Sequence, residues 1–268
     1  MNTTRHALIT GGSRGIGLAI ARQLLQQDYR VTLVARNAQA LDQAQEELGQ
    51  PGLGKPELGQ PDRVYAVVAD VSQRASVVHA FEQARSRHGP IDVLVNNAGQ
   101  AQSQRFDRMD EDVWQTMLDV NLGGVFHCTQ AALGDMVARK WGRIVNVAST
   151  AGLTGYAYVS AYCAAKHGVV GLTRALAQEV AMQGVTVNAI CPGFTETDIV
   201  RTAVQNIADK TGQSSGQAQA SLMRHNPQGR LVQPDEVAAM VVWLCQPQAA
   251  SINGQTIAVD GGELAGSR

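Results

Sequence analysis

Thr10-Gly11-Gly12-Ser13-Arg14-Gly15-Ile16-Gly17 is the stretch of this chain that decides the fold. It follows a short apolar segment at 6–10 and leads into an amphipathic segment at 15–27, so we expect it to join a strand to a helix. The spacing Gly-x-x-x-Gly-x-Gly differs from the usual dinucleotide fingerprint, but the physical basis is shared. Glycines permit a tight turn and close backbone approach, and the N-terminus of a helix attracts phosphate. Such a turn is often only structural, but its place between a first strand and a first helix favours dinucleotide binding.

The rest of the chain alternates apolar, β-branched runs with longer helical segments, which is typical of a parallel α/β sheet. We expect strands at 6–10, 30–35, 63–68, 91–95, 143–148, 185–191 and 255–259. Helices are expected near 15–27, 38–48, 73–88, 111–139, 159–182 and 234–245. Most strand candidates are continuously apolar, as strands covered on both faces are. The prediction is therefore a single Rossmann-type domain over residues 1–268, with a doubly wound, seven-stranded parallel sheet flanked by helices.

Two stretches interrupt this alternation. Residues 49–62 are rich in glycine and proline and are expected to form an exposed loop. Residues 194–230 are polar and separate the sixth strand from the last helix. A long segment at that place is more often a mobile lid than a separate domain, so we expect a substrate lid at about 194–225.

Composition narrows the function classes. The chain has 268 residues, 44% of them hydrophobic, and a net charge of −1, which suits one compact domain and offers no electrostatic footprint for nucleic acid. No apolar run reaches the ~20 residues that a membrane span needs, and the N-terminus does not resemble a signal peptide. The four cysteines are widely spaced, and neither they nor the six histidines show metal-ligand spacing. We therefore expect no metal and a cytoplasmic location.

The end of the second strand indicates which dinucleotide binds. Sites for NAD place an acid there, about 20 residues after the glycine turn, to bind the ribose 2′-hydroxyl. Residues 31–37 contain no acid, and Arg36 offers a planar donor set that suits a 2′-phosphate. Arg14, in the glycine turn, is expected to approach the same phosphate, although both arginines could simply be solvated. The sequence predicts NADP(H).

A second motif points to proton transfer. Tyr162 and Lys166 are four residues apart in a helical segment and therefore share one face, and Ser149 lies 13 residues before the tyrosine. A nearby ammonium is expected to lower the pKa of the phenol toward the working range, while a serine hydroxyl holds a carbonyl oxygen beside it. Tyr-x-x-x-Lys alone occurs by chance in many helices, so its weight depends on its neighbours.

Together these motifs resemble the short-chain dehydrogenase/reductase family along essentially the whole chain. The marks occur in the family order: Gly11, Gly15 and Gly17, Asp70-Val71, Asn96-Asn97-Ala98-Gly99, Asn121, Ser149, Tyr162, Lys166, Pro192-Gly193 and Thr197. The resemblance implies cofactor binding by Gly11, Ser13, Arg14, Gly15, Ile16, Gly17, Arg36, Asp70, Val71, Asn97, Ala98, Gly99, Tyr162, Lys166, Pro192, Gly193, Thr195 and Thr197. It implies catalysis by Asn121, Ser149, Tyr162 and Lys166, with Asn121 anchoring a water that relays protons to Lys166. An alternative, compatible role for Asn121 is to satisfy a helix irregularity.

The residues from Lys140 to Asp198 are similar to the β-ketoacyl thioester reductases of the family. The substrate is therefore expected to be a 3-oxoacyl thioester of CoA or of a carrier protein, and small cyclic or aryl ketones are the alternative. Relatives that act on carrier proteins have basic residues where this chain has Lys140 and Gln183, so the second position departs from their pattern. Substrate contacts are expected from Ser149, Ala151, Tyr156 and Tyr162, and also from Thr150, Leu153, Tyr158 and the lid.

The resemblance also implies a homotetramer that pairs the helices at 111–139 and 159–182. Two competing hypotheses are a non-enzymatic dinucleotide sensor on the same fold and an epimerase or dehydratase that also uses Tyr-x-x-x-Lys. The first is disfavoured because Ser149, Tyr162 and Lys166 are all present. The second is disfavoured by the glycine spacing and by the lack of a larger C-terminal substrate domain in this sequence.

Overall fold

One parallel sheet organises the molecule. The computed structural model describes residues 4–50, 60–224 and 226–265, so most of the loop predicted at 49–62 lies outside the described residues. The seven strands are β1 (His6–Thr10), β2 (Arg30–Ala35), β3 (Val64–Val68), β4 (Val93–Asn96), β5 (Gly142–Val147), β6 (Val185–Pro192) and β7 (Thr256–Val259). They pair in the order β3-β2-β1-β4-β5-β6-β7, all parallel. The predicted fold class is confirmed.

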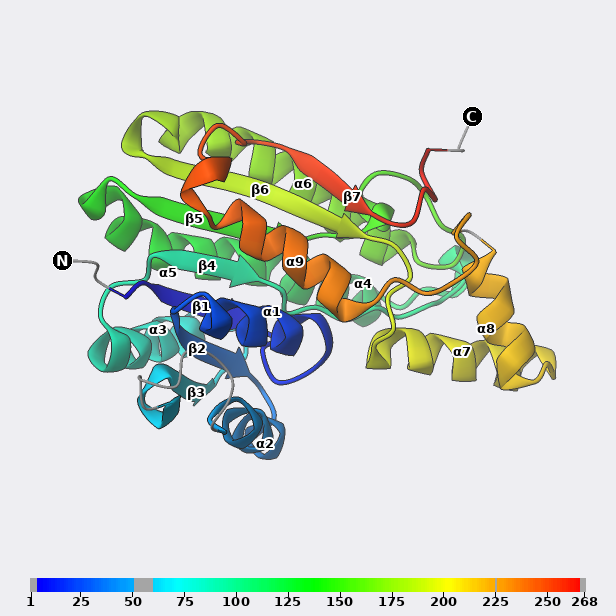
Figure 1. The fold of residues 1–268 in the computed structure, drawn as a ribbon. Coiled ribbons are helices and arrows are strands. Elements are labelled where there is room, and N and C mark those ends of the chain that lie inside the picture. Colours follow the sequence, from blue (N-terminus) through cyan, green and yellow to red (C-terminus); the bar gives the residue numbers. More distant parts are fainter. Residues whose placement is uncertain (1–3, 51–59, 225, 266–268) are drawn as a thin grey trace.

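Helices cover both faces of the sheet, and Figure 1 shows α1 and α9 in front of it with α5 and α6 behind. The helices are α1 (Gly15–Gln26), α2 (Ala38–Leu48), α3 (Arg74–His88), α4 (Glu111–Leu118), α5 (Gly124–Arg139), α6 (Ser160–Val180), α7 (Asp198–Thr211), α8 (Ser215–Met223) and α9 (Pro234–Leu244). Successive strand residues point to opposite faces, so Ala7 and Ile9 pack with α1, α2 and α9, whereas Leu8 packs with α3, α5 and α6. Helices bury both faces of the sheet, which is why most strands are apolar throughout.

The prediction of one continuous helix at 111–139 is wrong. The segment is divided into α4 and α5 by a π-helical segment, η3 (Asp119–Gly123), which contains Asn121. A π-helical segment adds one residue to a turn of the helix. One added residue barely changes the hydrophobic periodicity, so the sequence pattern does not reveal it.

The segment predicted as a polar lid contains two helices, α7 and α8, which the sequence analysis did not predict. The tract 211–216 contains the turn between them: Gly212 has a left-handed φ of 71°, and Ser214 and Gln217 form a reciprocal capping box. Both helices extend beyond the sheet in Figure 1. They are hard to recognise from the sequence because each buries only one side chain, Val200 in α7 and Ala218 in α8.

Candidate active site

A large cavity of about 1200 Å³ lies at the carboxyl ends of the strands. Strand order reverses between β1, which continues toward β2, and β4, which continues toward β5. In open parallel sheets, the crevice outside such a switch point is where ligands bind. Segments that follow the first six strands line this cavity, and α7 and the end of α8 close one side of it.

The glycine turn is held tightly at this switch point. Gly11 has a φ of 64°, and a Cβ built on it would lie 2.8 Å from Nδ2 of Asn97. That Nδ2 donates to the carbonyl oxygens of Thr10 (3.0 Å) and Gly11 (3.1 Å). A Cβ on Gly17 would lie only 2.2 Å from the Gly11 carbonyl oxygen. Glycine is therefore required at both positions, for conformation at the first and for space at the second.

Most residues predicted to bind a cofactor line this one cavity. They are Gly11, Ser13, Arg14, Gly15, Ile16, Arg36, Asp70, Val71, Asn97, Ala98, Gly99, Tyr162, Lys166, Pro192, Gly193, Thr195 and Thr197. Gly17 is buried behind the turn instead. Oδ1 of Asp70 accepts from the backbone (2.9 Å) and hydroxyl (2.7 Å) of Ser72, so this carboxylate also fixes its own turn. Contacts of these residues with a cofactor stay a prediction.

The two arginines predicted for a 2′-phosphate differ in their surroundings. Arg36 is exposed and follows β2 at the rim of the cavity. Nη1 of Arg14 lies 2.8 Å from Oδ2 of Asp198, at the start of α7, an ion pair that the sequence analysis missed. The pair forms because the lid begins against the glycine turn, where a Cβ on Gly15 would lie 3.3 Å from the Thr197 methyl carbon.

Ser149, Tyr162 and Lys166 are brought together at the centre of the cavity. Ser149 follows β5, and the other two residues lie in the first turns of α6. Nζ of Lys166 donates to the Val147 carbonyl oxygen (2.8 Å) and lies 5.7 Å from the centre of the Tyr162 ring. A hydrogen bond joins the side chains of Ser149 and Tyr162. The three groups thus surround a space where a carbonyl oxygen could accept a proton.

The pKa of the phenol is shifted in the direction opposite to our expectation. Burial raises the pKa of Tyr162 to about 12, and the hydrogen bond from Ser149 only partly opposes this. Burial also lowers the pKa of Lys166 to about 8, against a smaller opposing effect of Cys191. The sequence identifies the lysine charge but not the loss of hydration, which dominates in this position. At neutral pH the phenol is therefore protonated, as an acid must be.

Asn121 lies in the π-helical segment and is fully buried. Its amide donates to the carbonyl oxygens of Gln100 (3.0 Å) and Met117 (2.9 Å), and its Oδ1 accepts from the Gln100 backbone (3.1 Å). The role of satisfying a helix irregularity is confirmed. A Cβ on Gly99 would lie 2.8 Å from this Oδ1 and 3.7 Å from Nζ of Lys166, so the amide also lies beside the lysine. The water relay stays a prediction.

The substrate half of the cavity is lined by Ala151, Tyr156 and Tyr158, together with Thr150 and part of the lid. Leu153 was also expected there, but it packs into a small apolar cluster beneath the site instead. The cavity also receives cations that the sequence analysis did not select, namely Arg105, Arg108 and Lys210. No local motif marks them, because the loop and lid that carry them meet only in the fold.

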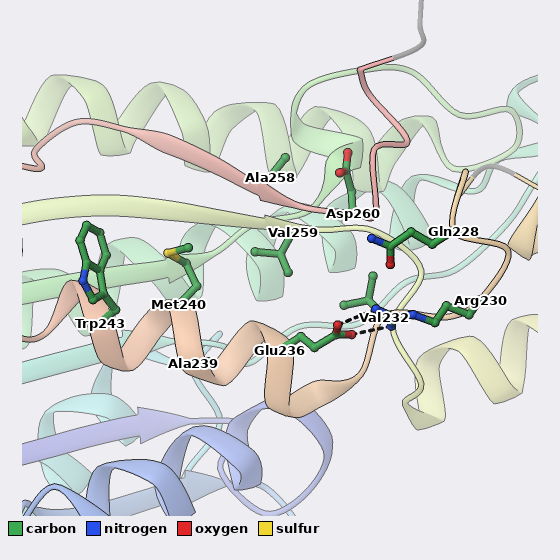
Figure 2. A pocket seen from close by; sticks show the side chains of 11 residues that line it. Gln228, Arg230, Val232, Glu236, Ala239, Met240, Trp243, Ala258, Val259 and Asp260 are labelled. Atoms are coloured by element: carbon green, nitrogen blue, oxygen red, sulfur yellow. Dashed lines mark hydrogen bonds and ion pairs between the residues drawn. The ribbon is translucent and has the colours of Figure 1, made fainter.

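A second, smaller cavity of about 450 Å³ lies between α9 and β7 (Figure 2). Figure 2 shows the side chains of Trp243 and Met240 pointing from α9 toward β7, with the ion pair of Arg230 and Glu236 at the end opposite Trp243. Trp243 is 45% exposed. None of the residues predicted for cofactor binding or catalysis is among those that line this hollow. Within the described part of the chain, no cluster of His, Cys, Asp and Glu could hold a metal ion.

A nucleotide-fold sheet that carries a glycine turn and a Ser-Tyr-Lys group in one cavity defines a class of oxidoreductases that act on CH–OH groups. The family model described as short chain dehydrogenase matches residues 5–208. The chain belongs to the short-chain dehydrogenase family.

Known relatives extend over nearly the whole chain. A putative ketoacyl reductase of Streptomyces coelicolor is 40% identical over 258 residues, which are 96% of this chain and 95% of the relative. An acetoacetyl-CoA reductase of Shinella zoogloeoides is 38% identical, covering 97% and 99%. Among solved structures, a variant of the actinorhodin polyketide ketoreductase with NADPH superposes with a TM-score of 0.89 at 38% identity, covering 97% of each chain. These similarities support an oxidoreductase that interconverts a ketone and an alcohol.

Proposed function

We propose that this protein is an NADP(H)-dependent reductase of 3-oxoacyl thioesters, carried by CoA or by a carrier protein. The observation that carries the proposal is the convergence of Ser149, Tyr162 and Lys166 with the glycine turn in one cavity. The chain is taken as one domain in which residues 194–225 serve as the substrate lid. The names of the relatives agree with this substrate class, since they include a ketoacyl reductase and an acetoacetyl-CoA reductase.

The residues present fit a dinucleotide phosphate. Gly11 and Gly15 both adopt a positive φ in the turn that leads into α1, and the N-terminus of a helix attracts phosphate. The cavity wall contains six cationic side chains, Arg14, Arg36, Arg105, Arg108, Lys166 and Lys210, but only two acids, Asp70 and Asp198. The end of β2 offers Arg36 and no carboxylate, which favours NADP(H) over NAD(H).

Proton transfer follows from the side chains around Tyr162. A bound nicotinamide supplies the hydride that adds to the carbonyl carbon of the substrate. Ser149 orients the carbonyl oxygen, and Tyr162 donates its proton to that oxygen as negative charge develops there. A phenol with a pKa of about 12 is protonated before the reaction, and the alkoxide is a stronger base than phenolate. Lys166, charged below about pH 8, then stabilises the phenolate that remains.

Two cations of the cavity wall, Arg108 and Lys210, support an anionic thioester carrier. Arg105 is paired with Asp107, whereas neither Arg108 nor Lys210 forms an ion pair with another described side chain. Phosphate groups of CoA or of a carrier-linked pantetheine would meet these cations at the cavity wall. The alternative, a small cyclic or aryl ketone, is favoured by the aromatic lining of Tyr156 and Phe194.

A substrate panel tests the proposal. Acetoacetyl-CoA, a β-ketoacyl carrier protein and simple cyclic and aryl ketones are each offered with NADPH and with NADH, and cofactor oxidation is followed by absorbance. We expect the thioesters with NADPH to give the highest kcat/KM, and a better ketone would transfer the assignment to the alternative. Tyr162→Phe should reduce turnover roughly 10²-fold or more while NADPH binding survives. Arg36→Asp should shift preference toward NADH, and equal efficiency of the unaltered protein with NADH would refute the NADP(H) assignment.

We also propose a cytoplasmic homotetramer. All four cysteines are free and buried, which agrees with a reducing compartment. No helix among the described residues has the length and apolarity to cross a bilayer. The helices expected to pair copies carry Phe126, 45% exposed, and are followed by Met182, 97% exposed. Light scattering tests the proposal, and a monomer would contradict it.

A further inference from the structure

The C-terminal turn brings a carboxylate to the substrate half of the main cavity. Asp260 accepts from the backbone N–H groups of Gly262 and Leu264 (2.9 Å each) and so closes the turn that follows β7. This turn directs Glu263 back toward the end of β6, where a Cβ on Gly193 would lie 2.8 Å from its Oε2. The carboxylate therefore lies at the point where the lid leaves the sheet.

Glu263 anchors the side chain of Tyr156, which lines the cavity. The Tyr156 hydroxyl hydrogen-bonds to Oε1 of Glu263, and it also contacts Oγ1 of Thr150 (2.9 Å). A carboxylate can only accept, so the phenol donates its single proton to Glu263, and the Thr150 hydroxyl is left to donate to the phenol. Burial and the neighbouring Glu263 raise the pKa of Tyr156, so this phenol remains a donor.

Because the Tyr156 hydroxyl is bonded to Glu263 and Thr150, the side chain presents its ring carbons to the substrate half of the cavity. Thr150 directly follows Ser149, so the anchored ring stands next to the proton-transfer group. Tyr156 meets the ring of Phe194 edge to face, with centroids 6.0 Å apart at 79°. Both rings line the cavity, while the polar end of Tyr156 is bonded to Glu263 and Thr150. The wall therefore suits an apolar substituent on the reacting ketone, and a carboxylate there would be repelled by Glu263 behind the ring.

We propose that Glu263 is a positioning residue that fixes Tyr156 as a wall beside the reacting carbonyl and thereby selects short, apolar acyl groups. This inference rests on the proposed function, because it assigns the acyl end of the same substrate. The proposed role also gives a reason for the contact between Glu263 and Tyr156, which are 107 positions apart in the sequence.

The test compares chain-length profiles. Purified protein is assayed with NADPH and a series of 3-oxoacyl N-acetylcysteamine thioesters of increasing acyl length. We expect Glu263→Ala to lower kcat/KM for the shortest substrates roughly tenfold, mainly through KM, because a hydrogen bond to a charged group is lost. The ratio of kcat/KM for short acyl substrates to that for long ones should fall in the same variant. Glu263→Gln, which keeps an accepting oxygen, should retain most of the discrimination, and Glu82→Ala, an exposed acid on α3, should change nothing.

A double-mutant cycle separates positioning from a general structural effect. Tyr156→Phe removes the same hydrogen bond from the other side, so the double variant with Glu263→Ala should be no worse than either single variant. NADPH affinity and melting temperature should stay near those of the unaltered protein. Additive effects, an unchanged chain-length profile, or an equal loss for every substrate in kcat alone would each overturn the inference. If no thioester is turned over, the proposed function fails instead, and the same comparison is made on ketones of increasing size.

Discussion

Acidification should destabilise this protein through His6, a buried residue of β1. His6 is 1% exposed; its Nδ1 lies 2.9 Å from the Gly89 carbonyl oxygen and its Nε2 lies 2.9 Å from Oγ1 of Thr32. The carbonyl can only accept, so Nδ1 carries the proton and Nε2 accepts from the threonine. The imidazole is thus satisfied when neutral, and burial lowers the pKa of His6 from 6.5 to about 4.

The size of the effect follows from linkage. Because the pKa of the folded state is lowered, the stabilisation is complete above about pH 6.5 and is lost as the pH falls toward about 4. Between about pH 7.5 and about pH 5, this one group should remove roughly 2 kcal/mol from the free energy of unfolding. Burial lowers the pKa of the neighbouring His88 too, which acts in the same direction.

Urea unfolding at the two pH values, followed by tryptophan fluorescence, measures the loss. His6→Gln is the comparison, since it removes the titrating group whatever its own cost at neutral pH. The loss on acidification should be roughly 2 kcal/mol smaller in the variant. Equal losses in the two proteins would refute the assignment to His6, even if both are sensitive to acid.

Three further predictions concern the glycine turn, the lysine and the outer face. Gly17→Ala should lower the melting temperature and abolish NADPH binding, because its Cβ would lie 2.2 Å from a carbonyl oxygen of the turn; Gly134→Ala, with nothing within 4 Å, should raise the melting temperature by a few degrees. Ketone reduction should slow as pH rises through about 8, where Lys166 loses its charge, and a flat rate profile would contradict this. Phe126→Glu, on the helix α5 that is expected to pair copies, should weaken a tetramer in light scattering, whereas the same change at exposed Phe106 should not.

Hydrophobic patterning predicted the sheet because each strand is buried on both faces, and it predicted the cavity because the motifs follow consecutive strands. It did not predict α7 and α8, whose amphipathic faces cover an open cavity rather than a core. It did not reveal the π-helical segment either, because one extra residue barely changes the periodicity; only Asn121 itself suggested an irregular helix.

The electrostatics of the site were the least predictable part. The proximity of Lys166 to Tyr162 follows from their spacing, but the dominance of burial over charge depends on packing from several elements. Asp198 and Glu263 had no local signal, since each acts on a residue more than 100 positions away in the chain.

The hydrogen bonds between Asn97 and the glycine turn affect the order in which the chain can fold. The bonds from Nδ2 of Asn97 to Thr10 and Gly11 join residues 87 and 86 positions apart, and β1 pairs with β4 as well as with β2. Closing so long a loop costs entropy before any contact compensates for it. During synthesis, the turn cannot reach its final geometry until β4 has left the ribosome. A nascent chain that ends before β4 should therefore fail to bind nucleotide, although it already contains every residue of the glycine motif.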